Sequence, residues 1–181
     1  MKYVQARSFI ARLSSMTPGK EGILDSVEWE SGANARKNNW LTLSSEWSVA
    51  HQQRFWFGYY EGRDPGYVIR TVRLEDGDDD FSPWDLSRNG YVGYYVTSRN
   101  PVRWRIWNHG QVFGLPLAGR CEQITIAAVG SVPLGIRKQP RFEEQYIQAG
   151  AAIKLILCLD IEHTDVPEFD QSGGLDAYRR R

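Results

Sequence analysis

Residues 151–163 read AAIKLILCLDIEH, and this stretch decides the fold class. Branched apolar side chains occupy every second position from Ile153 to Ile161, which is the period of an extended chain and not that of a helix. The positions between them are polar at both ends and apolar in the middle, at Ile156 and Cys158. We therefore predict a strand that lies inside a sheet, with other strands on both sides.

Further segments with apolar residues at alternate positions, or with aromatic residues around a glycine, predict the neighbouring strands. They lie at 23–30, 41–49, 55–60, 67–74, 90–97, 102–107, 111–117 and 121–129. Polar or proline-containing residues 31–39 and 130–140 predict connections, and residues 82–84 predict one helical turn. The sequence thus predicts an all-β protein, an antiparallel β-sandwich or single jelly roll of about eight or nine strands.

The 181 residues are typical of one domain that can bury a core without disulfides or metal. We predict an N-terminal arm or first strand at 1–20, a β-sandwich at 21–163 and a flexible polar tail at 164–181. Residues 1–20 are basic and contain no acid, so a targeting segment is a further interpretation of them. No run is apolar enough for a secretion signal or a membrane helix. We expect the protein in the virion if it is viral, and otherwise in the cytoplasm.

Charge and composition favour association with other proteins over binding to nucleic acid. The chain carries 22 basic and 22 acidic residues, a formal net charge of zero, so its overall field does not attract phosphate. Aromatic residues make up 13% of the chain, with seven Trp and nine Tyr, more than a minimal core needs. The additional rings are expected either to be covered by sheets and loops or to contact a partner.

The sequence shows no set of residues that predicts catalysis. The histidines His51, His109 and His163 stand alone, without the spacing that places two imidazoles on one metal. No serine or cysteine nucleophile motif and no glycine-rich phosphate loop occurs. Cys121 and Cys158 are expected to be buried thiols, unless neighbouring strands bring them together as a pair. We therefore expect no enzymatic activity.

One acidic loop has a spacing that partly matches a calcium site. Asp76, Asp78 and Asp80 alternate, and carboxylate oxygens suit Ca²⁺. The helical calcium loop would require Gly where Phe81 stands and Glu where Ser87 stands. A solvated loop tip is the simpler interpretation, and no cofactor is expected other than this calcium ion.

The aromatic residues supply the candidate contact sites. Trp47 and Trp104 share a face with the apolar residues of their strands and are expected in the core. Aromatic and arginine side chains of the opposite parity are expected at an interface or stacked on a ligand, because both types are enriched at interaction hot spots. These candidates are Trp40, Trp56, Tyr60, Tyr94, Arg103, Arg105 and Trp107.

Two functions compete for these residues. The first is a structural protein that assembles with itself or with other virion proteins. It resembles the jelly-roll capsid or virion subunits of viruses and phages in class alone, because no motif identifies a family. The alternative is a carbohydrate-binding module or lectin, in which exposed rings stack on glycans and calcium assists. Neither function requires strong nucleic-acid binding or a membrane span.

Overall fold

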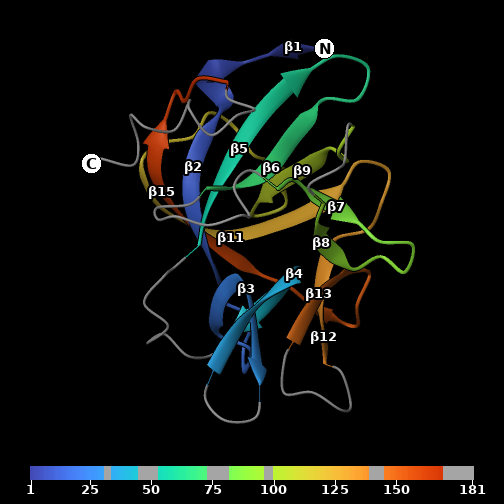
Figure 1. Ribbon diagram of the computed structural model, residues 1–181. Helices are drawn as coiled ribbons and strands as arrows, with labels where there is room; N and C mark the ends of the chain where they lie inside the picture. Colours follow the sequence, from blue (N-terminus) through green and yellow to red (C-terminus); the bar gives the residue numbers. More distant parts are fainter. Residues whose placement is uncertain (31–33, 45–52, 73–81, 96–99, 139–144, 169–181) are drawn as a thin grey trace.

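The computed structural model consists of antiparallel strands and one short 3₁₀ helix (Figure 1). It describes residues 1–30, 34–44, 53–72, 82–95, 100–138 and 145–168, with the backbone alone at 26–30 and 34–38. The described strands number fifteen. The all-β, antiparallel class predicted from the sequence is thereby confirmed, but the predicted eight or nine strands are too few. Several strands are only two or three residues long, too short to show an alternating pattern.

In chain order, the elements are β1 Lys2–Tyr3, η1 Gln5–Arg7, β2 Phe9–Ser15, β3 Gly22–Glu30, β4 Asn34–Ser44, β5 Arg54–Glu61, β6 Gly66–Val72, β7 Trp84–Leu86, β8 Val92–Tyr94, β9 Trp104–Asn108, β10 Gln111–Val112, β11 Gly119–Ala128, β12 Leu134–Lys138, β13 Gln145–Ala149, β14 Ile153–Lys154 and β15 Leu157–Thr164.

Six of these strands close on themselves and form what we call the ring. β2 pairs with β5, and the pairing continues through β6, β9 and β11 to β15, which pairs again with β2. Ring neighbours therefore follow one another in chain order. The jelly-roll order of strands is not confirmed. Alternation in a sequence predicts which side of a strand is buried, but it contains no information about which strand lies next to it.

Seven further strands, which we call the extension, sit in connections between ring strands and pair with one another. β3 and β4 lie between β2 and β5, β7 and β8 lie between β6 and β9, and β12 to β14 lie between β11 and β15. β4 is central to this extension, because it pairs with β3, β8 and β13. In Figure 1 most of the extension lies below the ring.

The stretch at 151–163 divides into two strands instead of one. Leu155, Leu157, Leu159 and Ile161 are at most 3% exposed and lie in the core, as their alternation predicts. Ile153 is 38% exposed and belongs to β14, which pairs with β12 of the extension, whereas β15 lies inside the ring. The chain thus leaves one part of the sheet and enters another within the stretch, at residues 155 and 156, which belong to neither strand.

A single core runs through the ring and the extension. Phe9 stacks on Phe57 at 4.5 Å between ring centroids, and Trp104 packs edge-on against Trp84 at 5.8 Å. Both tryptophans are fully buried. Trp104 therefore occupies the core position predicted for it, and Trp84 joins the ring strands to β7 of the extension. Trp47 lies outside the described residues.

Three predicted connections or turns contain strands instead. The polar segment 31–39 overlaps β4, whose first half pairs with β3 from Glu30↔Asn34 to Val27↔Lys37. Residues 82–84 lead into β7 and not into a helical turn, and 130–140 contains β12. Pairing with neighbouring strands holds these segments extended, and their composition alone did not predict that pairing.

A second, smaller apolar cluster lies on the outside of the ring. Ile10, Trp56 and Val68 form its centre with Val166 of the segment after β15, and Tyr3 of β1 packs against it. Residues 1–20 thus provide both a ring strand and a cover for the ring. Of the segment 164–181, residues 164–168 follow the same outer face, and the remainder lies outside the described residues.

Candidate interaction surfaces

Five of the seven predicted contact residues project from one side of the ring. Along β5, and from the residue before β9 through β9, these side chains alternate with side chains of the core. They therefore point away from the core. These five are Trp56, Tyr60, Arg103, Arg105 and Trp107. The structure thus confirms their common parity, but their surroundings differ.

Trp56 is buried and not available to a partner. Its exposed fraction is 0%, and Tyr3 stacks on it at 6.1 Å with an interplanar angle of 17°. The indole also lies over Gly58, where the missing side chain leaves room for it. The Tyr3 hydroxyl donates a hydrogen bond to the Val166 carbonyl, which ties both terminal segments together above the indole. Trp56 is therefore no longer among the candidate contact residues.

Tyr60 and Arg103 interact with each other beside this cluster. The Arg103 guanidinium lies 4.6 Å from the centre of the Tyr60 ring, and the Tyr60 hydroxyl donates a 2.7 Å hydrogen bond to Glu168. Burial raises the pKa of Tyr60 far above its ordinary value, with Glu168 adding to the rise. Burial and the charge of Arg70 lower the pKa of Arg103, against the opposing effect of Tyr60. This contact joins the segment after β15 to the ring.

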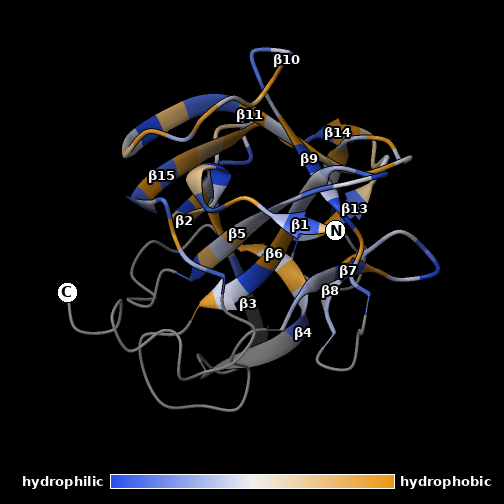
Figure 2. Cartoon of the chain, turned by 90° about the horizontal axis from the view of Figure 1, so that it is seen from above, coloured by the Kyte–Doolittle hydropathy of each residue, from blue (hydrophilic) through white to orange (hydrophobic). Residues whose placement is uncertain are grey.

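An exposed apolar loop follows β9, and Trp107 lies at its base. Trp107 is half-buried and pairs across the hairpin with Val112, which is 76% exposed. Leu115 and Leu117 in the same loop are 68% and 80% exposed. We call Trp107, Val112, Leu115 and Leu117 the apolar loop surface. Figure 2 shows the loop that carries β10 projecting from the ring.

Buried residues hold this loop in place. Phe113 is 6% exposed and packs against Phe9 at 5.7 Å between ring centroids. Its amide donates to the Ile106 carbonyl at 2.9 Å, and its carbonyl accepts from Arg7 at 3.1 Å. Pro116 is also buried. Phe113 and Pro116 fix the loop to the ring, and the aliphatic side chains next to them, Val112, Leu115 and Leu117, are presented outward.

The remaining predicted residues, Trp40 and Tyr94, belong to the extension. Tyr94 packs against the core. Trp40 is half-buried on β4, opposite Gly93 of β8, and its ring leans over that glycine, where a Cβ would lie only 3.2 Å from the indole. Trp40 therefore stays a candidate contact residue, whereas the half-buried Tyr94 is directed against the core.

Four half-buried rings surround Gly93 and continue onto β13. Trp40 meets Tyr91 edge-on at 6.1 Å, and Tyr91 meets Tyr146 edge-on at the same distance. The Tyr95 ring approaches Gly93 beside Trp40. We call Trp40, Tyr91, Tyr95 and Tyr146 the aromatic face. It comes from three separate parts of the chain, which the pairing of β4 with β8 and β13 brings together.

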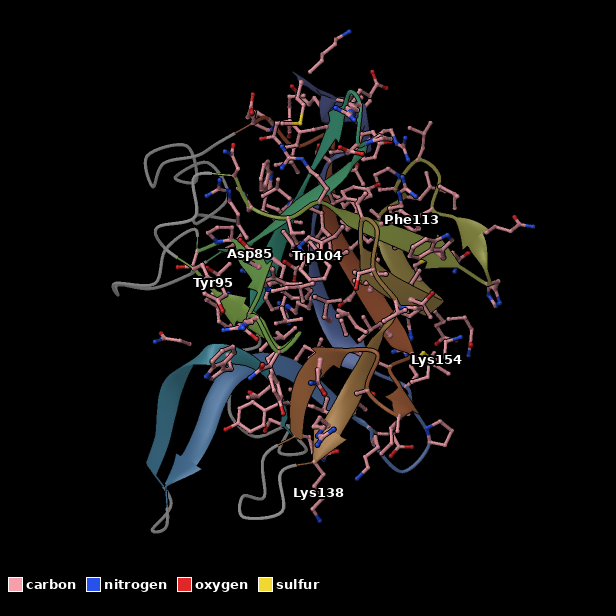
Figure 3. All side chains as sticks on the ribbon, turned by 90° about the vertical axis from the view of Figure 1, so that its right-hand side faces the viewer. Asp85, Tyr95, Trp104, Phe113, Lys138 and Lys154 are labelled. Carbon is pink, nitrogen blue, oxygen red and sulfur yellow. The ribbon has the colours of Figure 1, made fainter. Side chains whose placement is uncertain are left out.

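Polar groups border the aromatic face at both ends. Asp85 of β7 pairs with Gly93, and together with burial its charge raises the pKa of Tyr95. Figure 3 shows Asp85 and Tyr95 on the same side of the molecule. At the other end, Arg137 of β12 is exposed and pairs with Tyr146. Among the residues that the structure describes, the face therefore combines half-buried aromatic rings with one acidic and one basic side chain at its borders.

A groove of about 460 Å³, lined by both charged and apolar residues, opens where β2, β3, β11 and β15 meet. Arg120, Asp160 and Arg12 stand in one cross-strand row in it, so each carboxylate or guanidinium faces an opposite charge. Glu162, which continues this charged surface, bridges Arg12 and Arg54 by ion pairs, the first at 2.6 Å. The charges of the groove are balanced among its own residues, which suits a structural role.

Cys121 and Cys158 lie on neighbouring strands but do not pair. Cys121 is opposite Leu159 and packs against the core, whereas Cys158 is opposite Ser14 and lines the groove on the other side of the sheet. Both are free thiols, and burial raises the pKa of each. Side chains on opposite faces of a sheet cannot meet, so adjacency of the strands is not sufficient for a disulfide.

The calcium prediction stays a prediction, because Asp76, Asp78 and Asp80 lie outside the described residues. Within the described part of the chain, no group of three His, Cys, Asp or Glu side chains is placed to hold a metal ion. A helix of the length and apolarity needed to cross a membrane is likewise missing from the described residues.

Sequence reasoning missed the apolar loop surface and the extent of the aromatic face. Residues 111–117 alternate weakly and predicted a strand, although only Gln111–Val112 pairs in one. The run of Val112, Leu115 and Leu117 around Gly114 and Pro116 was the available signal. Tyr146 could not be connected to Trp40 without knowing that β13 pairs with β4.

The two surfaces are the basis for assigning a function, because similarity to known proteins supplies none. Neither contains a nucleophile next to a base, and each presents rings or aliphatic side chains suited to binding. Comparisons of the chain with protein-family models, with curated proteins and with solved structures gave no match.

Proposed function

We propose that this protein is a structural, non-catalytic subunit that assembles with further copies of itself through the apolar loop surface. The observation that carries the proposal is the exposure of Val112, Leu115 and Leu117, at 76%, 68% and 80%, on a loop that buried residues hold in place. Contiguous exposed apolar side chains usually mark an interaction site. Trp107 at the base of the loop adds the type of residue that most often anchors interfaces.

The size of this surface favours an assembly with repeated contacts over a simple dimer. Covering three aliphatic side chains that are about three-quarters exposed contributes roughly 3–7 kcal/mol, at about 1.5–3 kcal/mol for each fully buried side chain. Association costs about 4–15 kcal/mol of translational and rotational freedom. One loop contact by itself therefore gives only a weak association. Several contacts made at once, as in a closed shell, would be strong together.

The finer assignment that we propose is a subunit of a virus or phage particle, forming part of a shell or spike. The zero net charge supports contacts between copies and argues against wrapping a genome. The all-β class supports it only by analogy. A jelly-roll arrangement stays a prediction, and the assembly through the apolar loop does not depend on it.

Charge substitutions in the loop test the proposal. We expect Leu117→Asp to shift purified protein from an assembled species to monomer, because a carboxylate at a covered apolar contact lacks a partner. The matched control is Val132→Asp. Val132 is also exposed, at 54%, but follows β11 at the end away from the apolar loop. The measurement is sedimentation velocity, with circular dichroism to verify folding.

Three outcomes decide whether the apolar loop surface is the contact between copies. Loss of assembly in Leu117→Asp with retention in Val132→Asp supports the proposal. Assembly that survives both Leu117→Asp and Trp107→Ala rejects the loop as the contact. Wild-type protein that is monomeric at every concentration rejects self-assembly altogether.

A further inference from the structure

The apolar loop surface needs a counterpart on the neighbouring copy. Val112, Leu115 and Leu117 are 76%, 68% and 80% exposed, so in a single copy they project into solvent. Two identical loops that met about a two-fold axis would form a contact that closes after two copies. Contact with a different surface of the neighbour repeats from copy to copy. An assembly of many subunits through the loop therefore needs a second, different surface.

The groove of about 460 Å³ between β2, β3, β11 and β15 supplies such a surface. Its volume lies within the roughly 300–1,000 Å³ of protein clefts that hold small molecules, so it has room for a few side chains of a partner. Arg12 and Ser14 line it and alternate on β2 with the core residue Leu13, so the groove opens away from the core. In Figure 2 the loop with β10 and the strands β11, β15 and β2 follow one another around the ring.

The groove has a partly apolar bottom and a charged border. Ile23 and Cys158 of its lining are only 4% and 2% exposed. The charged side chains of the lining are nearer to solvent, because Glu21 and Asp160 are exposed and the Arg120 side chain is 64% exposed. An apolar centre with a polar border that excludes water is the arrangement of interface hot spots.

The charges of the groove suit an uncharged occupant. Its lining contains two basic residues, Arg12 and Arg120, and two acidic residues, Glu21 and Asp160. Asp160 lies between the two arginines in the cross-strand row, so their charges oppose one another within the groove. Residues 110–119, which carry the apolar loop surface, contain no Asp, Glu, Lys or Arg. The loop therefore enters this groove without leaving a charge unbalanced.

Both partners of this contact are already fixed in the single copy. Met16, a half-buried residue of the groove lining, donates its amide to the Ile156 carbonyl at 2.8 Å. The Thr17 hydroxyl accepts the Ile156 amide at 2.8 Å and donates to the Lys154 carbonyl at 3.1 Å. Phe113 holds the loop to the core in the same way. Docking of two fixed surfaces loses little conformational freedom, which favours association.

We propose that the groove is the acceptor for the apolar loop surface of a neighbouring copy. Leu115 and Leu117 of one copy cover Met16 and Ile23 of the next, and the charged border of the groove surrounds the loop. Each copy offers one loop and one groove, so the contact continues from copy to copy. This inference rests on the proposed function, because it identifies the second half of the same contact.

A charge placed in the groove tests the proposal. We expect Met16→Asp to convert assembled protein to monomer in sedimentation velocity, as Leu117→Asp does, because the covered carboxylate lacks a partner. Val132→Asp is the matched control, since Val132 is exposed but lines neither the loop surface nor the groove. Circular dichroism verifies that each variant is folded.

Disulfide cross-linking tests the same contact without relying on a disruptive charge. The two native cysteines are first removed by Cys121→Ser and Cys158→Ser. Addition of Leu117→Cys together with Met16→Cys should then give a ladder of dimers, trimers and larger species on a non-reducing gel after oxidation. Leu117→Cys without Met16→Cys should stay monomeric on that gel, whereas a loop-to-loop contact would link it into dimers.

The results separate this inference from the proposed function. Met16→Asp that stays assembled while Leu117→Asp becomes monomeric overturns the groove as acceptor and leaves assembly through the loop intact. Absence of the ladder, or dimers from Leu117→Cys alone, overturns it equally, and cross-linking decides if Met16→Asp does not fold. Wild-type protein that is monomeric at every concentration rejects the proposed function and this inference with it.

Discussion

Replacement of Gly58 by alanine tests the packing on the outside of the ring. A Cβ at this position would overlap two carbon atoms of the Trp56 indole and lie 2.6 Å from a third. The indole cannot move aside easily, because it is fully buried between Tyr3, Ile10 and Val68. Gly58→Ala therefore either expels the ring or shifts β5.

The smaller of these two costs sets the expected effect. Expelling the indole would cost about 3–5 kcal/mol, as for removing a buried tryptophan, whereas a shift that relieves overpacking costs about 1–3 kcal/mol. Alanine returns up to about 1 kcal/mol through the lower entropy of the unfolded chain. We expect Gly58→Ala to lower the free energy of unfolding by about 1–2 kcal/mol and Tm by about 2–8 °C.

A double-mutant cycle assigns this loss to the indole. In a Trp56→Leu background the overlapping atoms are absent, so Gly58→Ala should be neutral or slightly stabilising. Gly114→Ala is the control, because nothing lies within 4 Å of a Cβ there. The assay is urea unfolding followed by far-ultraviolet circular dichroism. An equal cost of Gly58→Ala in both backgrounds, or no cost in the wild type, would refute the packing described here.

Three further predictions concern charge, pH and thiols. Glu162→Gln should lower the free energy of unfolding by about 2–3 kcal/mol in the urea assay, because two guanidinium groups lose a shared and largely buried carboxylate. The control is Glu122→Gln, which breaks an exposed ion pair with Arg120 and should lower the free energy of unfolding by less than about 1 kcal/mol. Burial raises the pKa of Tyr67 to about 12. The stability that the neutral phenol contributes below pH 10 should therefore fall as pH rises towards 12, by up to about 2–3 kcal/mol. Tyr67→Phe should lose less of its free energy of unfolding than the wild type between pH 8 and pH 11.5. Cys121 and Cys158 should both react with a thiol reagent after unfolding without reductant, and an unreactive pair would contradict the free thiols described here.

Short-range alternation predicted the residues of the core but not the arrangement of the strands. Leu157, Leu159 and Ile161 lie in the core as their spacing indicates, because the side on which a residue projects depends only on its position in a strand. Closure of the ring depends on contacts such as Phe9↔Phe57, far apart in the chain. Such contacts leave no local pattern, so neither the ring nor the departure of Ile153 from it was predictable.

The candidate surfaces were partly predictable for the same reason. Parity identified Trp56 and Trp107 as outward-facing, and both are. Parity does not reveal cover, and the segments that cover Trp56 come from both ends of the described chain, at Tyr3 and Val166. Trp40 was among the candidates, but its grouping with Tyr146 required the pairing of β13 with β4.

The most direct test of the central claim is the solution mass of the wild-type full-length protein, measured by light scattering after size exclusion over a range of concentrations. Self-assembly through the apolar loop surface predicts a discrete species of many subunits that persists on dilution and is lost in Leu117→Asp. A wild-type protein that elutes as a monomer at every concentration would contradict the claim.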